Sequence, residues 1–227
     1  MAEQIRNSGP AETRTGSSVL GERLRRERAD RGLSLRELAR RLDVSPSLVS
    51  QIETGKIQPS VRTLYAIVSE LGVSLDEVFG GDRQTALPRS KRGQRAAQHG
   101  TGAAAGAPSA RDSEPGPVQR AALRRVLELE AGVRWERLTT RNEREVEFLY
   151  TVYPPGGESA PADALVRHTG REFGIVLGGK LGVTVGFEDY VLEPGDSVFF
   201  DSTVPHRLHN DGDETVTAVW VVLGRQP

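Results

Sequence analysis

Three of the four histidines in this chain lie in its last sixty residues, close to carboxylate and amide side chains. The segment 168–172 reads HTGRE, and the segment 206–210 reads HRLHN. Imidazole nitrogens and carboxylate oxygens are common ligands of divalent transition metals. The chain contains no cysteine, which excludes disulfides and thiolate chemistry. These two segments are therefore the candidates for metal chemistry, provided that the fold brings them together.

The region that contains both segments has the pattern of a β-domain. From Val118 onward, the hydrophobicity has a period of two, and Gly, Pro and Asp separate short β-rich runs. Such spacing is typical of an antiparallel sandwich or barrel, a class that includes jelly rolls. The segment 123–129 fits either a brief helix or an early strand. The runs read ERLTT, VEFLYTVYPPGG, EFGIVLGGKLGVTVGFEDYVLEPGDSVFFDSTVPHRLHN and TVTAVWVVLG.

The two histidine segments resemble the two sequence motifs of the cupin family. The first motif reads His-x-His, then Glu after three or four residues, then Gly after six more. His168 stands at the second His position, Glu172 at the Glu and Gly179 at the Gly, while Val166 replaces the first His. The resemblance covers about the last hundred residues, and it is specific because turn glycines and ligand positions agree together.

The second cupin motif is also matched, with two departures. Gly195, His206 and Asn210 fall at the expected spacing. Asp201 replaces the usual Pro, and Thr203 replaces the usual Gly. The resemblance implies that this half of the chain folds as an all-β cupin jelly-roll barrel.

The cupin resemblance also implies a metal site formed by His168, Glu172 and His206. Two imidazoles and one carboxylate suit a non-haem divalent metal with open positions, iron(II) in particular; zinc, manganese and nickel are further candidates. Three protein ligands are the number of an open site rather than a closed structural one. By strand parity, Asn210 points into the barrel with His206 and is a candidate for the ligand pocket, whereas His209 points outward. The alternative is a hydrogen-bonded polar cluster in the barrel mouth.

A second group of motifs lies near the N-terminus, where residues 34–57 predict two short helices with a tight joint. Ser34 and Glu37 have the spacing of a capping box, which starts the first helix. Ser45 caps the second helix, and Pro46 occupies its first position. The apolar residues of both helices keep helical spacing, and they are Leu35, Leu38, Ala39, Leu42, Leu48, Val49 and Ile52. This pattern predicts a helix-turn-helix.

Further helices complete a bundle around this motif. A helix is expected over residues 19–31, another from Ser60 to Leu71, and a short one that Ser74 and Glu77 open as a capping box. Gly32, Gly55 and Gly72 are suited to end helices in the left-handed conformation. The sequence therefore predicts an all-α bundle of five helices over residues 19–80.

The helix-turn-helix resembles that of the lambda/434-repressor-like bacterial regulators, over about sixty residues. Asp43 stands in the turn, where that family commonly has glycine, and Asp tolerates the left-handed conformation. The resemblance implies that the second helix of the motif enters the major groove of operator DNA. The candidates for reading bases are Ser45, Pro46, Ser47, Ser50 and Gln51; those for binding phosphates are Ser34, Arg36, Arg40 and Lys56. For Arg36 and Arg40, a solvated helix face is the alternative.

Composition places the remaining segments. Residues 1–18 are polar and without periodicity, which predicts a disordered tail, and residues 81–117 predict a flexible linker. The cupin domain is expected over residues 118–227. The net charge of −1 hides a basic segment 83–111 and an acidic C-terminal half. No run approaches twenty apolar residues, and the N-terminus lacks a signal-peptide pattern, so a cytoplasmic protein that does not associate with membranes is expected.

Together, the two resemblances describe a class of bacterial transcriptional regulators. They imply operator DNA and a small-molecule effector as partners, and a homodimer held by the cupin domain. A variant of this interpretation is a DNA-binding regulator whose cupin domain serves only to dimerise the chain. The rival is an iron enzyme resembling hydroxypropylphosphonate epoxidase, which has a similar domain order and a His-x-x-x-Glu…His triad. Fold alone cannot separate regulator from enzyme, and the exposed Ser47, Ser50 and Gln51 favour the regulator.

Overall fold

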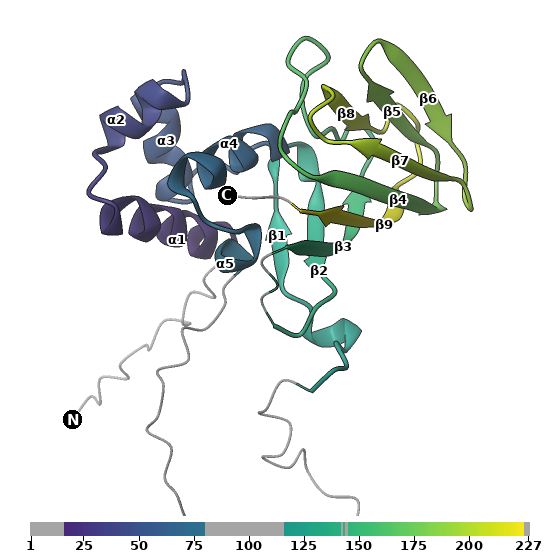
Figure 1. The fold of residues 1–227 in the computed structure, drawn as a ribbon, viewed down its shortest axis with the longest axis horizontal. Helices are drawn as coiled ribbons and strands as arrows, with labels where there is room; N and C mark the ends of the chain where they lie inside the picture. The colour runs from purple at the N-terminus through teal and green to yellow at the C-terminus, as the bar shows by residue number, and fades with distance from the viewer. Residues whose placement is uncertain (1–15, 80–115, 142, 144, 225–227) are drawn as a thin grey trace, which may run out of the picture.

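The chain forms a helical domain followed by a β-domain (Figure 1). In the computed structural model, the described residues are 16–79, 116–141, 143 and 145–224. Most of the predicted tail 1–18 and linker 81–117 lies outside the described residues, and the domain boundaries remain predictions. Within the described ranges, no helix is long and apolar enough to cross a membrane.

Five helices build the N-terminal domain, as the sequence predicted. They are α1 (Gly16–Asp30), α2 (Leu35–Arg41), α3 (Pro46–Glu53), α4 (Val61–Leu71) and α5 (Leu75–Phe79). Helix α1 begins at Gly16 rather than at the expected Val19. The inward leucines and valines of α1 to α4 form one core, in which Leu24, Leu38, Val49 and Leu64 are almost completely buried.

Serine side chains cap the starts of four of these helices, α2 to α5. The hydroxyls of Ser34, Ser45 and Ser60 each accept a hydrogen bond of 3.1 Å from the backbone N–H three residues later. Each such cap contributes about 1 kcal/mol to helix stability. The capping box of Ser74 and Glu77 is reciprocal, since each residue's backbone N–H donates to the other's side chain.

Two turn residues adopt the backbone conformation that the sequence suggested. Asp43 has a φ of 54°, and Gly55 has a φ of 68°. The box expected at Ser34 is only half formed, because the Glu37 carboxylate turns outward to Arg40 and Arg41. Glu37 accepts three charge-assisted hydrogen bonds there, two from Arg40 and one from Arg41, and both arginines lie within about one helical turn of it.

The β-domain is a sandwich of two antiparallel sheets, as expected for a cupin jelly roll. The larger sheet has the order β1-β2-β3-β9-β4-β7, and the smaller has the order β6-β5-β8. The strands are β1 (Val126–Glu128), β2 (Arg134–Arg137), β3 (Val146–Tyr153), β4 (Arg171–Gly178), β5 (Leu181–Val185), β6 (Glu188–Leu192), β7 (Ser197–Asp201), β8 (His206–His209) and β9 (Val216–Leu223). Side chains alternate between the two faces, so every second residue of β9, from Val216 to Val222, is buried.

The first strands of this domain differ in two details from the sequence-based expectations. The run ERLTT was expected as a strand, but β2 ends at Arg137. The undecided segment 123–129 contains the end of a 3-10 helix (Ala121–Leu123) and the strand β1. The reason is tertiary, because β1 is held in place by its pairing with β2.

The helical domain is docked on the β-domain through the start of α4, which lies beside the barrel (Figure 1). The backbone N–H of Glu130 donates to the carbonyl of Pro59 at 3.0 Å. The backbone N–H of Arg62 donates to the carbonyl of Ser159 at 3.2 Å. These two bonds bring α4 to the mouth of the barrel, where the histidine segments also meet.

Candidate functional site

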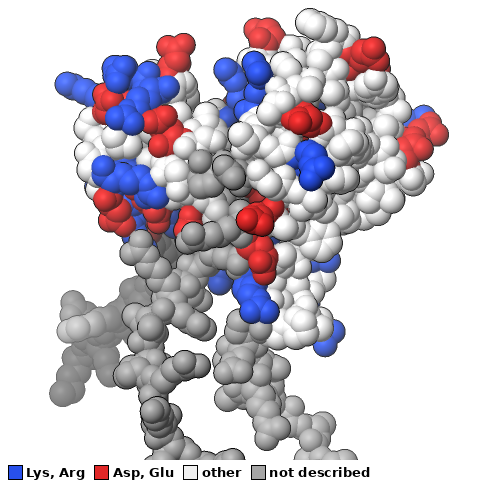
Figure 2. All heavy atoms as spheres, viewed as in Figure 1, with Lys and Arg blue, Asp and Glu red and all other residues white. Residues whose placement is uncertain are grey.

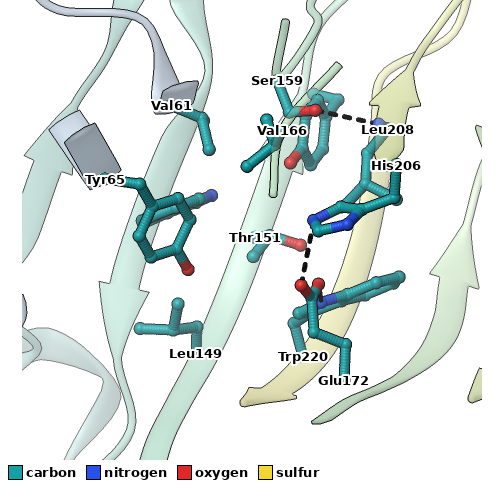
Figure 3. Close-up of a pocket in the computed structure, with 12 residues that line it drawn as sticks. Val61, Tyr65, Leu149, Thr151, Ser159, Val166, Glu172, His206, Leu208 and Trp220 are labelled. Carbon is teal, nitrogen blue, oxygen red and sulfur yellow. Dashed lines mark hydrogen bonds and ion pairs between the residues drawn. The ribbon is translucent and has the colours of Figure 1, made fainter. Parts of the chain in front are cut away.

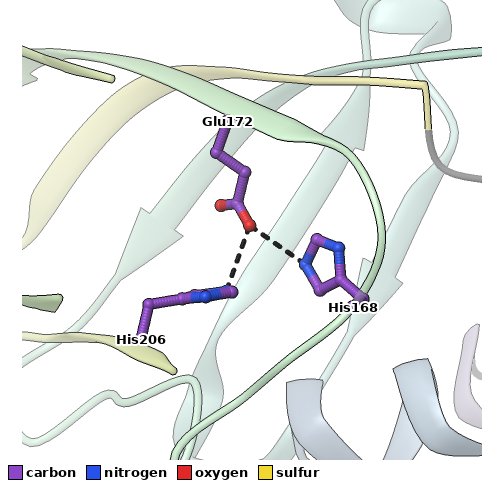
Figure 4. A group of neighbouring side chains, drawn as sticks. All are labelled: His168, Glu172 and His206. Atoms are coloured by element: carbon purple, nitrogen blue, oxygen red, sulfur yellow. Dashed lines mark ion pairs between the residues drawn. The ribbon is translucent and has the colours of Figure 1, made fainter. Parts of the chain in front are cut away.

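The fold brings His168, Glu172 and His206 together inside the barrel mouth (Figure 4). Glu172 lies on β4, His168 precedes that strand, and His206 begins β8. Nε2 of His168 lies 3.0 Å from Oε1 of Glu172, and Nε2 of His206 lies 3.1 Å from the same oxygen. All three side chains are buried, so the donor atoms are held away from bulk water.

Backbone carbonyls determine which ring nitrogen of each histidine faces the site. Nδ1 of His168 lies 3.0 Å from the carbonyl oxygen of Thr169, and Nδ1 of His206 lies 2.9 Å from that of Val204. A carbonyl only accepts, so each Nδ1 carries a hydrogen, and in the neutral rings both Nε2 lone pairs point at Glu172. With the rings neutral, Nε2 of His168 and Oε1 of Glu172 have no hydrogen-bond partner among the described residues, and a proton on Nε2 would let it donate to Oε1.

This convergence of lone pairs fits a divalent metal ion. Histidines that bind metals typically donate their other N–H to a carbonyl or carboxylate, as both do here. The second carboxylate oxygen, Oε2 of Glu172, accepts a 2.6 Å hydrogen bond from Nε1 of Trp220, which orients the carboxylate. His168, Glu172 and His206 can therefore hold a metal, with coordination positions left open.

Without a metal, a proton on a histidine ring supplies the positive charge that compensates the Glu172 carboxylate. Burial raises the pKa of the Glu172 carboxyl, but the hydrogen bonds and charges of His168 and His206 outweigh burial and hold that pKa well below its usual range. Burial lowers the pKa of His206, but the Glu172 carboxylate and the Val204 carbonyl together raise it above its ordinary value. The cluster therefore favours an ionised carboxylate and a positive partner.

A small cavity adjoins the three residues (Figure 3). Its volume is about 20 Å³, which is room for one water molecule or one ion. Most of its wall belongs to the barrel and is apolar or aromatic, with Trp135, Tyr153 and Trp220 among the lining residues. Two further lining residues, Val61 and Tyr65, come from α4 of the helical domain.

The structure places Asn210 differently from the pocket role expected for it. Its side-chain amide donates to the carbonyls of Tyr153 and Glu214, and its oxygen accepts from the N–H of Gly212. Asn210 is buried as parity indicated, but these bonds tie together the turn after β8. His209 points away from the cluster as expected and lies 2.9 Å from Asp211.

The second candidate site is the outer face of the helix-turn-helix. Pro46, Ser47 and Gln51 on α3 are exposed, and Ser50 is half-buried. Arg36 and Lys56 flank this row and are exposed as well. Figure 2 shows basic side chains gathered over this end of the helical domain, with acidic ones among them.

Three of the predicted DNA contacts already have partners within the protein. The hydroxyls of Ser34 and Ser45 serve as helix caps. Arg40 makes two hydrogen bonds with Glu37, at 2.8 and 3.1 Å. A phosphate contact from Arg40 would therefore need this ion pair to open, which leaves Arg36 and Lys56 as the readier cations.

Comparison with known proteins agrees with both halves of the structure. A helix-turn-helix family model matches residues 24–78, and a cupin domain model matches residues 149–222. The HTH-type transcriptional regulator PuuR of Escherichia coli strain K12 is 26% identical over 192 residues, which cover 84% of this chain and 86% of that protein. The chain is a helix-turn-helix transcriptional regulator with a cupin domain.

Solved structures agree with the fold of the regulator. A helix-turn-helix family regulator from Vibrio cholerae has a TM-score of 0.59 at 19% identity, over 93% of this chain and 100% of that one. Hydroxypropylphosphonic acid epoxidase from S. wedmorenis reaches a TM-score of only 0.40 at 20% identity, with 93% and 100% coverage. That likeness is too low to bear on activity.

One residue of the regulator's cupin site escaped sequence reasoning. Tyr65 lies on α4, and its ring stacks on His168 with 4.4 Å between centroids. The available signal is that Val61, Tyr65 and Val68 recur at i, i+4 and i+7, a second buried row beside the one that fills the helical core. The sequence does not reveal which surface that row meets.

Proposed function

We propose that this protein binds operator DNA specifically and that its cupin site senses a metal ion, a small molecule or both. The observation that carries the proposal is the exposed row on α3, with Pro46, Ser47 and Gln51 free of the domain core. In a helix-turn-helix, this row faces the base edges of the major groove. The expected metals are iron, zinc, manganese or nickel, bound by His168, Glu172 and His206.

Specific recognition is assigned to Gln51 and general affinity to Lys56. Gln51→Ala is expected to relax base preference, because a glutamine amide can bind adenine bidentately, at a cost of about 1–3 kcal/mol of discrimination when lost. Lys56→Ala is expected to weaken binding to all sequences alike, because phosphate contacts carry no sequence information. Competition with single-base operator variants measures both. An unchanged preference profile for Gln51→Ala contradicts the assigned register of α3.

A homodimer is expected to hold two recognition helices about one DNA turn, ~34 Å, apart. The outer face of the larger sheet provides an apolar surface for it, formed by Phe173, Ile175, Leu177 and Phe199. The rings of Phe173 and Phe199 lie 4.9 Å apart, so the surface is continuous across β4 and β7. Contiguous apolar surface of this kind marks association sites.

The edge of this apolar surface carries one charge of each sign, so it is complementary to a second copy of itself. Arg171 and Asp201 are register partners at the neighbouring ends of β4 and β7. Two copies of the surface therefore meet without net repulsion, as a two-fold symmetric interface requires. A second copy of this chain is accordingly the partner we assign to it.

Phe199→Arg is expected to convert the dimer to monomer, because it places an unpaired charge within the apolar surface. Mass measured by light scattering and operator affinity should both fall. Phe187→Arg is the matched control, since Phe187 is fully exposed on the turn between β5 and β6. Equal masses for wild type and Phe199→Arg would move the dimer interface elsewhere.

The enzyme alternative rests on the open donor set of two histidines and one carboxylate, which is also the set of non-haem iron oxygenases. It makes a separate demand: iron(II)-loaded protein must consume an oxidant as an organic substrate turns over. The regulator needs only binding. A selection from random duplexes that enriches no sequence contradicts the regulator.

A further inference from the structure

Helix α4 of the DNA-binding domain closes the cupin site. Tyr65 is 6% exposed, and its ring lies 4.4 Å from that of His168, at 30°, and 5.6 Å from that of Trp135. Its hydroxyl donates a 3.0 Å hydrogen bond to Oε2 of Glu147 on β3. Figure 3 shows Tyr65 and Val61 facing His206 and Glu172 across the cavity. A residue of one domain thus contacts a candidate metal ligand of the other.

The closed cavity is too small for a metabolite. Pockets that bind small organic molecules measure about 300–1,000 Å³, whereas this cavity measures about 20 Å³. A water molecule or a metal ion fits without any movement. An organic ligand requires one wall of the cavity to move.

The barrel walls are held by many more bonds than the α4 wall. Leu149, Thr151, Glu172 and Trp220 lie on β3, β4 and β9, which pair along their lengths. The loop wall at Val166 is tied to His206 by two backbone hydrogen bonds of 2.8 and 2.9 Å. The bonds across the α4 wall include the Tyr65–Glu147 bond and the two backbone bonds at Pro59 and Arg62, and the helical domain also contacts β1 through α1. Among the described residues, no strand ladder runs across this contact between domains, so α4 is the wall that opens at least cost.

We infer that an organic ligand enters the cupin site only when α4 withdraws Tyr65, so that ligand binding and the docked state of the helical domain exclude each other. This inference rests on one part of the proposed function, namely that the cupin site binds a ligand. Helix α4 packs against α1 and α2, and both of these helices pack against α3. Withdrawal of α4 therefore moves the recognition helix relative to the barrel.

The site also indicates a chemical class for this ligand. One ionised carboxylate, Glu172, offsets only part of the charge of a divalent ion held there, which leaves a net positive site. The surrounding lining residues include Trp135, Leu149 and Trp220, which favour an apolar or aromatic body. The class is a small organic carboxylate with an apolar body, for which benzoate is a simple probe.

A distance measurement tests the inference in the full-length protein. The chain has no cysteine, so Ala66→Cys on α4 and Phe187→Cys on the β5–β6 turn give one pair of dye positions in each protomer. Assembly with an excess of unlabelled protein confines energy transfer to a single protomer of the dimer. Both positions are exposed. Zn²⁺ alone should leave energy transfer between the dyes unchanged, because an ion fits the closed cavity. Benzoate added to the zinc-loaded protein should change it in a saturable way.

The Tyr65 variants test whether the α4 wall is the barrier to entry of an organic ligand. Tyr65→Ala should bind benzoate about tenfold to a hundredfold more tightly than wild type, because it removes both the ring contact and the hydrogen bond that hold the cavity closed. Tyr65→Phe keeps the ring but loses the hydrogen bond, so its benzoate affinity should lie between those of wild type and Tyr65→Ala. Circular dichroism controls for folding of each variant.

Three outcomes overturn the inference. They are equal benzoate affinity in wild type and Tyr65→Ala, no benzoate binding by Tyr65→Ala, and saturation of wild type without a change in energy transfer. The assay contains no DNA, so its failure is distinct from failure of operator binding. Loss of Zn²⁺ binding would contradict the metal assignment separately.

Discussion

His206→Ala is expected to abolish tight metal binding by the purified protein. The substitution removes one of three convergent donors and leaves His168 and Glu172, which cannot hold a divalent ion with comparable affinity. A loss of about 10²-fold or more in affinity is expected, since even changes in the groups that orient metal ligands cost about 10–100-fold. Metal content by mass spectrometry and titration with Co²⁺, Ni²⁺ and Zn²⁺ measure it.

His209→Ala is the control for this prediction. His209 lies three residues away on the same strand, but it points to the other face and pairs with Asp211. It should keep the wild-type metal content. If both variants bind metal equally well, His206 is not a ligand, and the polar-cluster interpretation of the site is the better one.

Glu53→Ala is expected to destabilise the helical domain by about 2–3 kcal/mol, because it removes two charge-assisted hydrogen bonds and leaves the half-buried Arg28 without its counter-ion. Arg28 on α1 and Glu53 on α3 make two hydrogen bonds, of 2.6 and 2.8 Å, and their side chains are only 12% and 5% exposed. The Glu53 hydrogen bond raises the pKa of Arg28 despite the opposing effect of burial. Chemical denaturation followed by circular dichroism measures the loss.

Glu37→Ala is the matched comparison, because Glu37 also pairs with arginines but at the surface. Exposed ion pairs contribute little to stability, so this change should have little effect. The double variant Arg28→Met, Glu53→Leu should recover most of the stability, since well-packed apolar residues can replace a buried pair. A loss below 1 kcal/mol in Glu53→Ala would mean that the buried pair contributes little.

The sequence by itself determined the features that depend on short-range physics. Ser45 and Ser60 cap helices by bonding to an N–H three residues away, and Asp43 enters the left-handed conformation where a turn requires it. These interactions involve neighbours in the chain, so residue type and spacing are sufficient to predict them. The resemblance to the cupin motifs likewise predicted the cluster of His168 and Glu172 with His206, although Glu172 and His206 come from different sheets.

Only the tertiary structure decided which surfaces meet. Tyr65 meets His168 because α4 docks on the barrel mouth, and Glu53 is buried because α1 crosses α3. The amide of Asn210, which parity placed inside the barrel, is bound to the Tyr153 and Glu214 carbonyls instead of facing the cavity. Periodicity in a sequence identifies a buried face but not the element that covers it. That choice depends on shape and packing summed over residues far apart in the chain.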